Sequence, residues 1–488
     1  MASRIFHEIL QNLPRPPNRQ ERLKNRPQAP WKILKSLSKG QMFSFSVGFF
    51  AWIMDAFDFF AVSVTLTRLR NQFEGKTIND LSTAITLTLL FRSLGAFVFG
   101  IITDRYGRRW PLTINLIIIA LLALGTGLLE TYTQFLAIRS LFGIAMGGVY
   151  GMATATSLEN LPVEARGLFS GILQEGYAVG YLLAASVNLT LVEDTNNWRS
   201  IFYLGAGLSF FVALLRAICP ESDVFLKARE ESRLHPDPLG RSPGKIYLES
   251  LTEALKLHWG RFVFTVFLMA GFNFLSHGSQ DLYPTFVQIS KGMTSKDASL
   301  ITIIGNCGAI IGGTISGWLS QFLGRRLTII CMIIWTAGFI PLWILPTSFS
   351  GLSLGAFFLQ FGVQGAWGVI PIYLSEIAPP AFRGIFTGLS YQLGNMISSA
   401  SSQIEARAGE SRQINVNGTR VADYAYVQSV LIGCITVYIL ILTCLGKEYR
   451  GRSFDEVAVV VTTVERGSDE NVEEGSVEEK KQILDSSK

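Results

Sequence analysis

The sequence predicts an all-α membrane protein with twelve transmembrane helices, arranged as two parallel repeats of six. Three observations support this fold class. First, 49% of the 488 residues are hydrophobic and only 16% are charged, which is too apolar for a soluble protein of this length. Second, apolar windows of membrane-spanning length recur along the whole chain. Third, motifs of the first half return in the second half at a constant offset.

Twelve apolar windows are long enough to cross about 30 Å of hydrocarbon. The first six lie near residues 43–66, 81–103, 110–129, 133–156, 168–190 and 200–219. Six more follow a hydrophilic gap, near residues 261–287, 298–320, 326–346, 350–374, 384–405 and 424–445. The eleventh window is rich in serine and less apolar than the others. The windows therefore predict two groups of six helices.

The segments outside the windows predict the domain organisation. We expect helical halves over 43–219 and 261–445, a basic N-terminal arm over 1–42, a linker over 220–260 and an acidic, disordered tail over 446–488. Lys and Arg collect on one side of twelve alternating spans, which predicts that both termini are cytosolic. The net charge of +5 comes mainly from this side. A basic arm beside anionic lipid needs no nucleic acid as a partner.

Two motifs reveal the internal repeat. The segment GIITDRYGRR over 100–109 returns as GWLSQFLGRR over 317–326, an offset of 217 residues. At the same offset, ENLPVEARG over 159–167 aligns with EIAPPAFRG over 376–384. Matches at one offset indicate that the chain consists of two homologous halves.

The charged side chains of these motifs are candidates for a gate. Charges at helix ends can cap neighbouring helices and form ion pairs that exist in only one conformation. The alternative is that they only set the topology and tie the loops down. Asp104 has Gln321 as its repeat partner, so a latch should be stronger in the first half. The predicted gating residues are Asp104, Arg105, Arg108, Arg109, Glu159, Arg166, Arg325, Arg326, Glu376 and Arg383.

A polar stripe interrupts the seventh window. At helical spacing Asn273, His277, Gln280, Asp281 and Thr285 fall on one side of the helix. Ionisable groups at membrane depth are costly unless they face protein or a water-filled cavity, so the stripe predicts a transport pathway.

Two features of this segment have a specific interpretation. His277 and Asp281 are four residues apart, close enough to share a proton; the alternative is a hydrogen bond that only holds the helix. Pro284 lacks an N–H group, so the helix should kink there and free the carbonyl of Gln280.

A buried cation is predicted in the second window. Arg92 lies about midway along it, and a guanidinium can grip a carboxylate with two parallel hydrogen bonds. The alternative is an internal ion pair with Asp55 or Asp58 in the first window. Both interpretations hold together if a substrate carboxylate replaces the aspartate, because binding would then be linked to protonation.

Other intramembrane polar residues are weaker candidates. Asp58 near mid-depth competes with His277 and Asp281 for the role of proton carrier. Glu175 in the fifth window aligns with Gln392 in the eleventh at the 217-residue offset, and Tyr391 beside it could shape the cavity. For these last residues an interhelical hydrogen bond of purely structural meaning is the alternative.

The motifs resemble a known transporter family. GxxxDRxGRR over 100–109, its copy over 317–326 and RSLFGIAMG over 139–147 resemble the major facilitator superfamily across nearly the whole chain. Within it, the pattern NxxSHxxQDxxxT is met in full, and it resembles the fungal Jen-type carboxylate permeases of the sialate:proton symporter-like group. The matching residues are Asn273, Ser276, His277, Gln280, Asp281 and Thr285.

The resemblance implies a plasma-membrane secondary active transporter that carries short-chain carboxylates with protons by alternating access. The substrates would be lactate, pyruvate and acetate, or succinate and malate. Residues expected to contact the substrate are Arg92, Asn273, Ser276, Gln280, Thr285, Tyr391 and Gln392. Those expected to carry the coupled proton are His277, Asp281, Asp58 and Glu175.

The same scaffold allows two alternative functions. The protein could be a carboxylate nutrient sensor or a transporter for another organic anion such as sialate. An enzyme is not expected, because no complete nucleophile-base or metal constellation and no GxxxxGK[ST] motif occurs. The five cysteines have no paired spacing, so we expect no metal and no cofactor. The expected partners are small carboxylates, protons and the lipid bilayer, with the protein a monomer.

Overall fold

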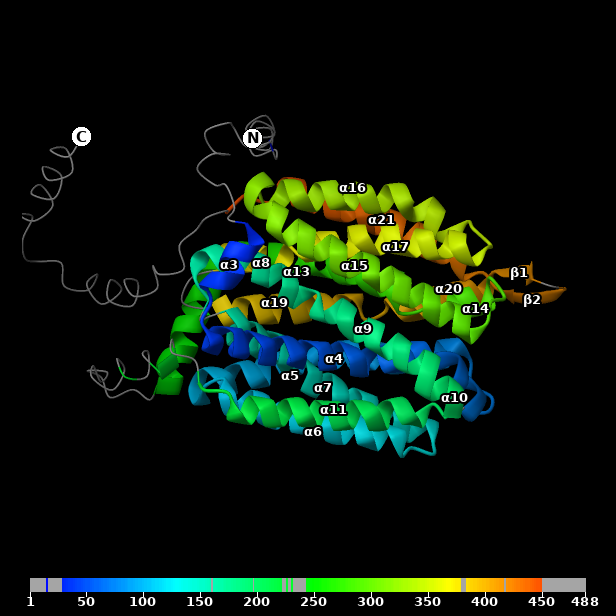
Figure 1. Cartoon of the computed structure of the whole chain (residues 1–488), viewed down its shortest axis with the longest axis horizontal. Helices are drawn as coiled ribbons and strands as arrows, with labels where there is room; N and C mark the ends of the chain where they lie inside the picture. Colours follow the sequence, from blue (N-terminus) through cyan, green and yellow to red (C-terminus); the bar gives the residue numbers. More distant parts are fainter. Residues whose placement is uncertain are drawn as a thin grey trace, which may run out of the picture.

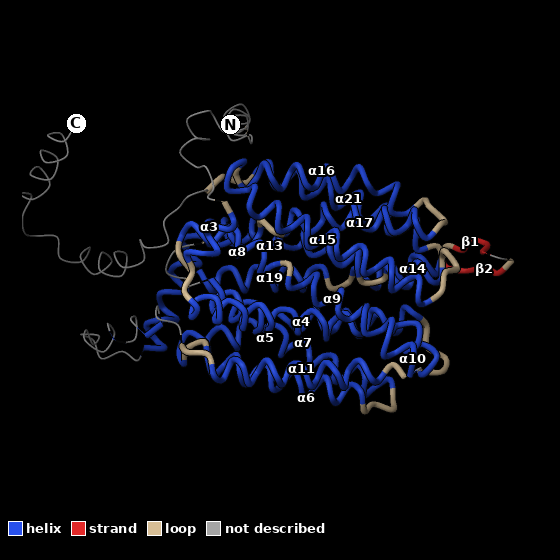
Figure 2. Tube along the Cα trace, in the orientation of Figure 1, coloured by secondary structure: helices blue, strands red, loops and turns tan. Residues whose placement is uncertain are grey.

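The computed structural model describes residues 15, 29–158, 161–195, 197–221, 225–226, 230, 243–378, 383–416 and 418–449. Most of the predicted N-terminal arm, much of the linker and the tail beyond residue 449 lie outside this part of the chain, as does Glu159. The side chains of Asp104, Arg105 and Arg383 are likewise outside the described residues. Figure 2 shows that the described chain is almost entirely helical, with one short pair of strands.

The first half consists of long helices and one broken one. Its elements are α3 (Pro30–Ser36), α4 (Lys39–Gln72), α5 (Ile78–Tyr106), α6 (Arg109–Gly127), α7 (Tyr132–Leu158), α8 (Val163–Gln174), α9 (Gly176–Val187), the π-helix η1 (Asn188–Val192), α10 (Glu193–Thr195) and α11 (Arg199–Ile218).

The second half repeats this order and adds a hairpin. Its elements are α13 (Pro243–Gln280), α14 (Tyr283–Ile289), α15 (Ser295–Leu323), α16 (Arg325–Ile344), α17 (Phe349–Trp367), α18 (Ile370–Ile377), α19 (Arg383–Ser398), α20 (Ser401–Ser411), β1 (Gln413–Val416), β2 (Thr419–Ala422) and α21 (Tyr424–Leu445). The strands pair antiparallel, with Gln413 opposite Ala422. Helix α13 begins inside the predicted linker and kinks at His258, where φ is −115° and ψ is 18°.

Ten helices in the described part of the chain are long and apolar enough to cross a membrane. The two predicted spans without such a helix are the fifth, near 168–190, and the eleventh, near 384–405. Both are occupied by interrupted helices, α8–α9–η1 and α19–α20. At the second break the hydroxyls of Ser398 and Ser399 bond carbonyls three residues earlier, which competes with the regular helix. The interruptions fall in the equivalent spans of the two halves, at different positions within them.

Helix termini confirm the repeat at the level of hydrogen bonds. Helix α5 begins with a capping box of Thr77 and Asp80, and α15 begins with the same box, Thr294 and Asp297, at the 217-residue offset. The two helices also end alike: Gly107 and Gly324 follow them with φ of 91° and 98°. Only glycine adopts this left-handed region without strain.

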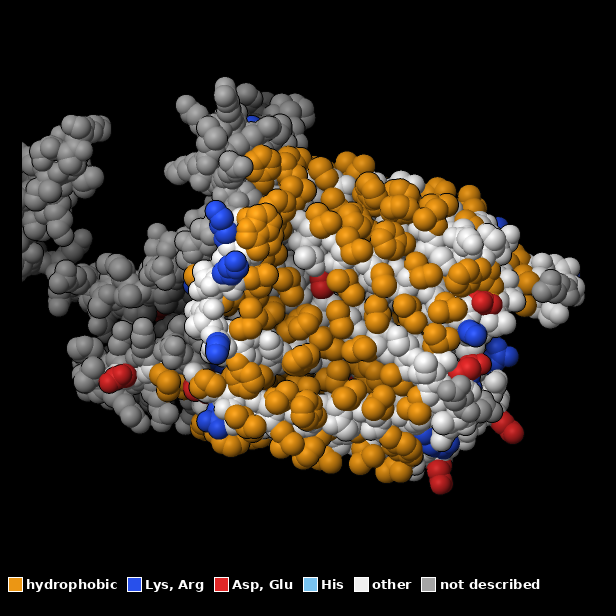
Figure 3. Space-filling model, viewed as in Figure 1, with side chains coloured by type: hydrophobic (Ala, Val, Ile, Leu, Met, Phe, Trp, Pro, Cys, Tyr) orange, Lys and Arg blue, Asp and Glu red, His pale blue; other side chains and the backbone are white. Residues whose placement is uncertain are grey.

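The two halves lie side by side with their helices roughly parallel (Figure 1). Helices α3 and α8 lie at one end of the bundle, here called the linker end, and β1 and β2 project from the other, here called the hairpin end. Hydrophobic side chains cover most of the visible face between the two ends, and most charged side chains on it lie near the ends (Figure 3). This distribution fits a protein that crosses a bilayer several times.

Candidate functional site

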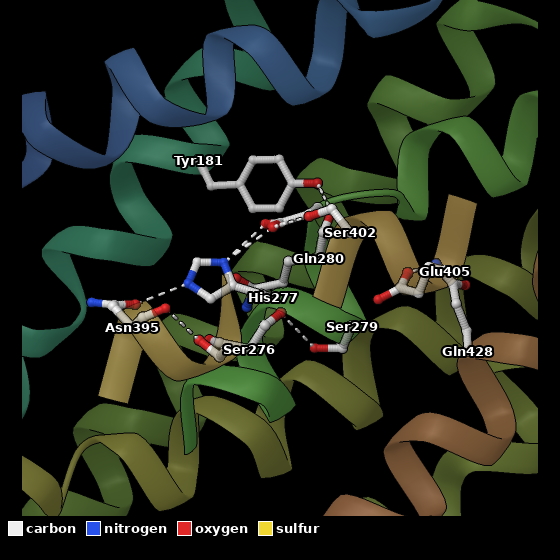
Figure 4. Close-up of polar contacts among 11 residues, drawn as sticks. Tyr181, Ser276, His277, Ser279, Gln280, Asn395, Ser402, Glu405 and Gln428 are labelled. Carbon is white, nitrogen blue, oxygen red and sulfur yellow. Dashed lines mark hydrogen bonds and ion pairs between the residues drawn. The ribbon is translucent and has the colours of Figure 1, made fainter. Parts of the chain in front are cut away.

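The predicted pair at the centre of the bundle is in direct contact. His277 Nδ1 lies 3.2 Å and 3.1 Å from the two carboxylate oxygens of Asp281, and both residues are buried. They occupy the last turn of α13 and the turn that follows it (Figure 4 shows the surroundings). The four-residue spacing on a helix explains why the two side chains meet.

Three residues of α19 and α20 complete this network. His277 Nε2 lies 3.1 Å from Asn395 Oδ1, while Asn395 Nδ2 donates to Gln392 Oε1 at 2.9 Å. On the other side, Ser402 Oγ donates to Asp281 Oδ2 at 2.9 Å. The network therefore runs from Gln392 through His277 and Asp281 to Ser402, and it joins α13 to both parts of the interrupted helix.

The orientation of Asn395 determines where a proton resides. Because Asn395 turns its oxygen toward Nε2, that ring nitrogen must carry hydrogen and donate. The contact between Nδ1 and the Asp281 carboxyl then requires one further proton, on either the imidazole or the carboxyl. This assignment follows from the amide orientation rather than from observed hydrogens. With this amide orientation, the hydrogen bond between imidazole and carboxyl contains one proton that either group could hold.

The break between α13 and α14 exposes the carbonyl that Pro284 was expected to free. Tyr181 OH, from α9, donates to the carbonyl oxygen of Gln280 at 2.9 Å. Gln280 Nε2 donates to Gln360 Oε1 at 2.8 Å, so this residue contacts both halves. The kink at Pro284 thus produces a hydrogen bond between the halves at the centre of the bundle.

The rest of the polar stripe is buried with spare hydrogen-bonding capacity. Asn273 Nδ2 donates to the carbonyl of Met269 at 2.8 Å. Among the described residues, Thr285 Oγ1 and Gln280 Oε1 have no hydrogen-bond partner. Ser276 is buried in the same region. Buried polar atoms without partners are rare, and a ligand or water can satisfy them.

A second buried cluster, of full charges, lies in the first half. Arg92 Nη2 donates to Asp55 Oδ2 at 3.2 Å, and each side chain is only 1% exposed. Arg139 is buried nearby and interacts electrostatically with Asp55 and Asp58, while Asp58 Oδ2 accepts from Ser209 at 3.0 Å. The sequence left Asp55 and Asp58 open as partners of Arg92, and the structure selects Asp55.

This charged cluster is not fully satisfied. Within the described residues, Arg92 Nε, Asp55 Oδ1, Asp58 Oδ1 and two guanidinium nitrogens of Arg139 have no hydrogen-bond partner. An unpaired donor of a buried arginine costs free energy unless a ligand or water takes it. The cluster can therefore accept an additional anionic group.

One aromatic ring contacts both clusters. The guanidinium carbon of Arg92 lies 5.3 Å from the centre of the Phe59 ring, and the His277 ring lies 5.5 Å from the same centre, edge-on. Phe59 is buried on α4. The buried cation of the first half and the His277–Asp281 pair of the second half thus lie next to the same side chain.

Aromatic side chains from both halves form a layer next to the site. Tyr150 of α7 stacks on Tyr391 of α19 with ring centres 4.3 Å apart. Trp52 of α4 contacts Tyr150 at 5.1 Å, and Trp367 of α17 contacts Tyr391 at 5.7 Å. Tyr391, expected to shape a cavity, is therefore part of an aromatic contact between the halves.

The first-half motif residues tie helices of one half together. The backbone N–H groups of Arg108 and Arg109, at the start of α6, both donate to the carboxylate of Glu221 at 3.0 Å. The Arg109 guanidinium also donates to the carbonyl of Ala217 in α11. Arg166 Nε donates to the carbonyl of Leu161 at 3.1 Å. A carboxylate at a helix N-terminus is stabilising.

The second half has the same device. The N–H groups of Arg325 and Arg326, at the start of α16, donate to Glu448 at 3.2 Å and 3.1 Å. Arg325 also forms a bidentate ion pair with Glu376, at 3.0 Å and 3.1 Å. The Arg326 guanidinium donates to carbonyls of Thr443 and Cys444. Each of these described contacts joins residues of the same half. This pattern fits the alternative that the charges tie loops and helices together.

Glu175 lies at the break between α8 and α9. Both of its carboxylate oxygens are buried without a hydrogen-bond partner in the described part of the chain. Its side chain packs against Gly313 of α15, where an added Cβ would come within 1.6 Å of Glu175 Oε1. It does not meet its repeat partner Gln392, whose amide nitrogen lies 3.5 Å from the carbonyl of Gly147.

The halves touch on both sides of the site. At the hairpin end, Gln403 Nε2 donates to Thr83 Oγ1 at 2.8 Å, joining α20 to α5. At the linker end α8 approaches α15 so closely that a Cβ on Gly317 would lie 2.9 Å from the Cα of Gly171. The polar centre is therefore enclosed, which matches the burial of its residues.

Several site residues were not predicted from the sequence. Asn395, Ser402 and Glu405 belong to the serine-rich eleventh window, and Tyr181 and Gln360 contact the kink of α13 from other helices. A signal existed for the first three, because polar residues at Gln392, Asn395, Ser402 and Glu405 recur on one helical side. In the described residues, no three His, Cys, Asp or Glu side chains stand close enough to hold a metal ion.

The chain is similar to several known transport proteins. The chain is 33% identical over 418 residues to a carboxylic acid transporter protein homologue of Saccharomyces cerevisiae, covering 83% of this chain and 68% of that protein. It is 27% identical to a cis,cis-muconate transport protein of Acinetobacter baylyi, over 72% of this chain and 84% of that protein. It is also 27% identical to the sialic acid transporter NanX of Escherichia coli, over 71% and 82%.

The fold has a solved counterpart. A partially occluded, inward-open structure of the xylose transporter XylE from E. coli superposes with a TM-score of 0.66 at 18% identity, covering 85% of this chain and 100% of that one. The family model of the Major Facilitator Superfamily matches residues 48–402. With its twofold helical repeat and buried polar centre, the chain is a multi-pass membrane protein that belongs to the Major Facilitator Superfamily of transporters.

Proposed function

We propose that the protein carries short-chain carboxylates together with protons across the plasma membrane, with both termini cytosolic. One observation carries the proposal: Arg92 of the first half and His277 of the second, which pairs with Asp281, both pack against the ring of Phe59. A cation that grips a carboxylate and a pair that releases a proton are what such a symporter needs. The names of the yeast and Acinetobacter relatives, which refer to carboxylic acid and muconate, support an organic anion as substrate.

Binding and protonation are coupled through Asp55. In the structure this carboxylate neutralises Arg92. A substrate carboxylate that takes the guanidinium leaves Asp55 as a buried anion without its partner, which is costly unless it accepts a proton. Substrate binding thereby favours proton binding, and the reverse holds by linkage. Asp58 is the second acid of this cluster and the alternative acceptor.

The second half orients the substrate and provides a further position for the coupled proton. Asn273, Ser276, Gln280 and Thr285 supply donors and acceptors around the anion, while His277 and Asp281 hold a proton between them. Tyr391 and Gln392 place α19 beside the same centre. Glu175 supplies a further buried acid toward the linker end. Release of the proton would return Asp281 to its charged carboxylate form, which can accept a proton in the next cycle.

We assign the motif residues at the linker end to gating, in which each half moves as a rigid unit. Their contacts with Glu221, Glu376 and Glu448 hold each half together, so that the halves rock as units. Opening at this end would separate α8 from α15 at Gly171 and Gly317. Asp104, Arg105, Glu159 and Arg383 complete the gating set by their place in the repeated motifs.

Uptake of labelled lactate and succinate into cells lacking their own permeases tests the proposal. We expect faster uptake of at least one acid at lower external pH, because protons drive the anion inward. Uptake of neither acid would point to a sensor or to another anion, and sialate is the first to try because of the similarity to NanX. An uptake rate that does not depend on the external pH would contradict proton coupling.

A further inference from the structure

A buried acid that the proposed cycle has not used lies one turn beyond the central network. Glu405 of α20 is 0% exposed. Gln428 Nε2 of α21 donates to its Oε2 at 3.1 Å, while Oε1 has no hydrogen-bond partner among the residues that the structure describes. Figure 4 shows Glu405 and Gln428 set apart from the His277 group, on the side of Ser402.

The surroundings of Glu405 favour its neutral, protonated form. In the described part of the chain no Lys, Arg or His forms an ion pair with it, and the neutral amide of Gln428 is its hydrogen-bond partner. Asp281, with its partner His277, faces it from α13 and is electrostatically coupled to it. An isolated buried carboxylate next to a second carboxyl is far costlier than a carboxylic acid. Glu405 is therefore a place where a proton is stored.

The other elements packed against α20 leave Glu405 to these partners. Helix α5 meets α20 through Thr83 and Asn79, which contact Gln403 and Glu410. Beyond the hairpin, Asp423 pairs with Arg412. These contacts occupy other positions of α20 and the segment after it, so the surroundings that decide the charge state of Glu405 are its burial, the amide of Gln428 and the nearby Asp281.

A short route connects Glu405 to the central pair. Ser402 lies three residues before Glu405, on the same side of α20, and its hydroxyl already donates to Asp281 Oδ2 at 2.9 Å. Helix α20 ends at Ser411, six residues after Glu405, at the hairpin end of the bundle. Glu405 thus stands between the central pair and that end.

The repeat adds an independent argument. At the 217-residue offset Glu405 aligns with Asn188 of η1, just as Glu175 aligns with Gln392. Each interrupted helix therefore carries one acid and one amide, in opposite order: the acid of the first half lies toward the linker end and that of the second half toward the hairpin end. The two buried acids flank the central pair on its two sides.

We propose that Glu405 is a second proton-binding position of the transport cycle, which supplies the central pair from the hairpin end. In the transfer, the O–H bond of the Glu405 carboxyl breaks and an O–H bond forms on Asp281, with the Ser402 hydroxyl accepting from one and donating to the other. Glu405 is then reprotonated from the hairpin end. This assignment rests on the proposed proton symport and specifies its route.

The test uses the full-length protein in proteoliposomes with Glu405→Gln, which keeps the shape and removes the titratable proton. Glu410→Gln is the matched control, because Glu410 lies on the same helix but is half-buried and accepts a hydrogen bond from the backbone N–H of Asn79. We expect Glu405→Gln to lose lactate accumulation driven by a pH gradient, about tenfold per pH unit at one proton per anion. Exchange of labelled for unlabelled lactate should persist, since it needs no net proton transfer.

Three outcomes separate the claims. Full pH-driven accumulation by Glu405→Gln, equal to that of Glu410→Gln, overturns the role of Glu405 alone. Absence of pH-driven accumulation by the unchanged protein overturns the proposed symport and this inference together. Loss of accumulation with retained exchange, in Glu405→Gln but not in Glu410→Gln, supports the inference.

A measurement on the unchanged protein covers the case in which the variant does not fold. Dicyclohexylcarbodiimide reacts with protonated carboxyl groups in apolar surroundings, and mass spectrometry locates the adduct. We expect an adduct on Glu405 that forms in parallel with the loss of pH-driven uptake. Labelling of other acids with none on Glu405, at a pH where transport is active, would overturn the inference.

Discussion

The two halves share one backbone plan but differ in the chemistry of their centres. The first half buries full charges, Arg92 with Asp55 and Arg139 near Asp58, and leaves several of their polar atoms without partners in the described structure. The second half buries His277 with Asp281 in a continuous hydrogen-bonded network. The first centre therefore keeps buried polar atoms without partners, whereas the second is a connected set of hydrogen bonds.

The repeat shows how the halves diverged. At the 217-residue offset Arg92 corresponds to Ala309 and Asp55 to Phe272, while Asp281 corresponds to Val64. At these three positions each half has an apolar residue where the other has a charge. If anion and proton are coupled as proposed, the coupling requires the interface between the halves.

The largest expected effect comes from removing the cation of the first half. Arg92→Gln leaves Asp55 buried without a partner, which we expect to lower the free energy of unfolding by about 3–5 kcal/mol. We also expect this variant to lose all lactate uptake. Asp55→Asn in the same chain removes the stranded charge, so thermal unfolding in detergent should recover toward that of the unchanged protein. Uptake should stay absent, and transport by the double variant would contradict the role of Arg92.

The next largest effect concerns the proton of the second half. Asp281→Asn keeps the shape and the hydrogen bond from Ser402 but holds no exchangeable carboxyl proton. We expect accumulation to lose about tenfold per unit of pH gradient, while exchange of bound lactate continues. Asp297 belongs to the capping box at the start of α15, so Asp297→Asn is the control. We expect this variant to accumulate lactate like the unchanged protein. Equal accumulation by both variants would remove Asp281 from the coupling.

A smaller effect should follow from changing the residue that orients His277. Asn395→Leu removes the acceptor for Nε2 and leaves a buried N–H without a partner, at a cost of about 1–3 kcal/mol. We expect the external pH that gives half-maximal uptake to shift, with lactate exchange retained. A variant with lower uptake at every pH and an unshifted profile would indicate a merely structural role for Asn395.

The smallest effects compare the same device in the two halves. Glu221→Gln and Glu448→Gln each remove a charge from a helix N-terminus, that of α6 and that of α16. We expect each to lower stability by about 0.3–1 kcal/mol, with similar losses because the geometry is repeated. Thermal unfolding of both variants provides the measurement. A large loss in one half alone would show that the two latches are not equivalent.

Much of the architecture could be predicted from the sequence because both of its signals are local. Apolar length located the helices, and a constant offset revealed the repeat, which Thr77 and Thr294 now show as matching caps. The contact of His277 with Asp281 also followed, since residues four apart on a helix meet whatever surrounds them.

Contacts between helices could not be predicted in the same way. Asp55 and Asp58 are both on α4, and only the packing of α5 against it makes Asp55 the partner of Arg92. Asn395 and Ser402 gain their meaning from facing α13, which a one-helix pattern does not show. The interruptions of the fifth and eleventh spans were likewise hidden, because an apolar window has the same composition whether its helix is regular or broken.

The central claim is that an anion and a proton cross together through the joint site of the two halves. Simultaneous recording of internal pH and labelled lactate in proteoliposomes containing the unchanged protein tests it most directly. We predict that lactate uptake acidifies the interior in constant proportion, and that Asp281→Asn exchanges lactate without any proton movement. Lactate accumulation by the unchanged protein with no change in internal pH would contradict the account.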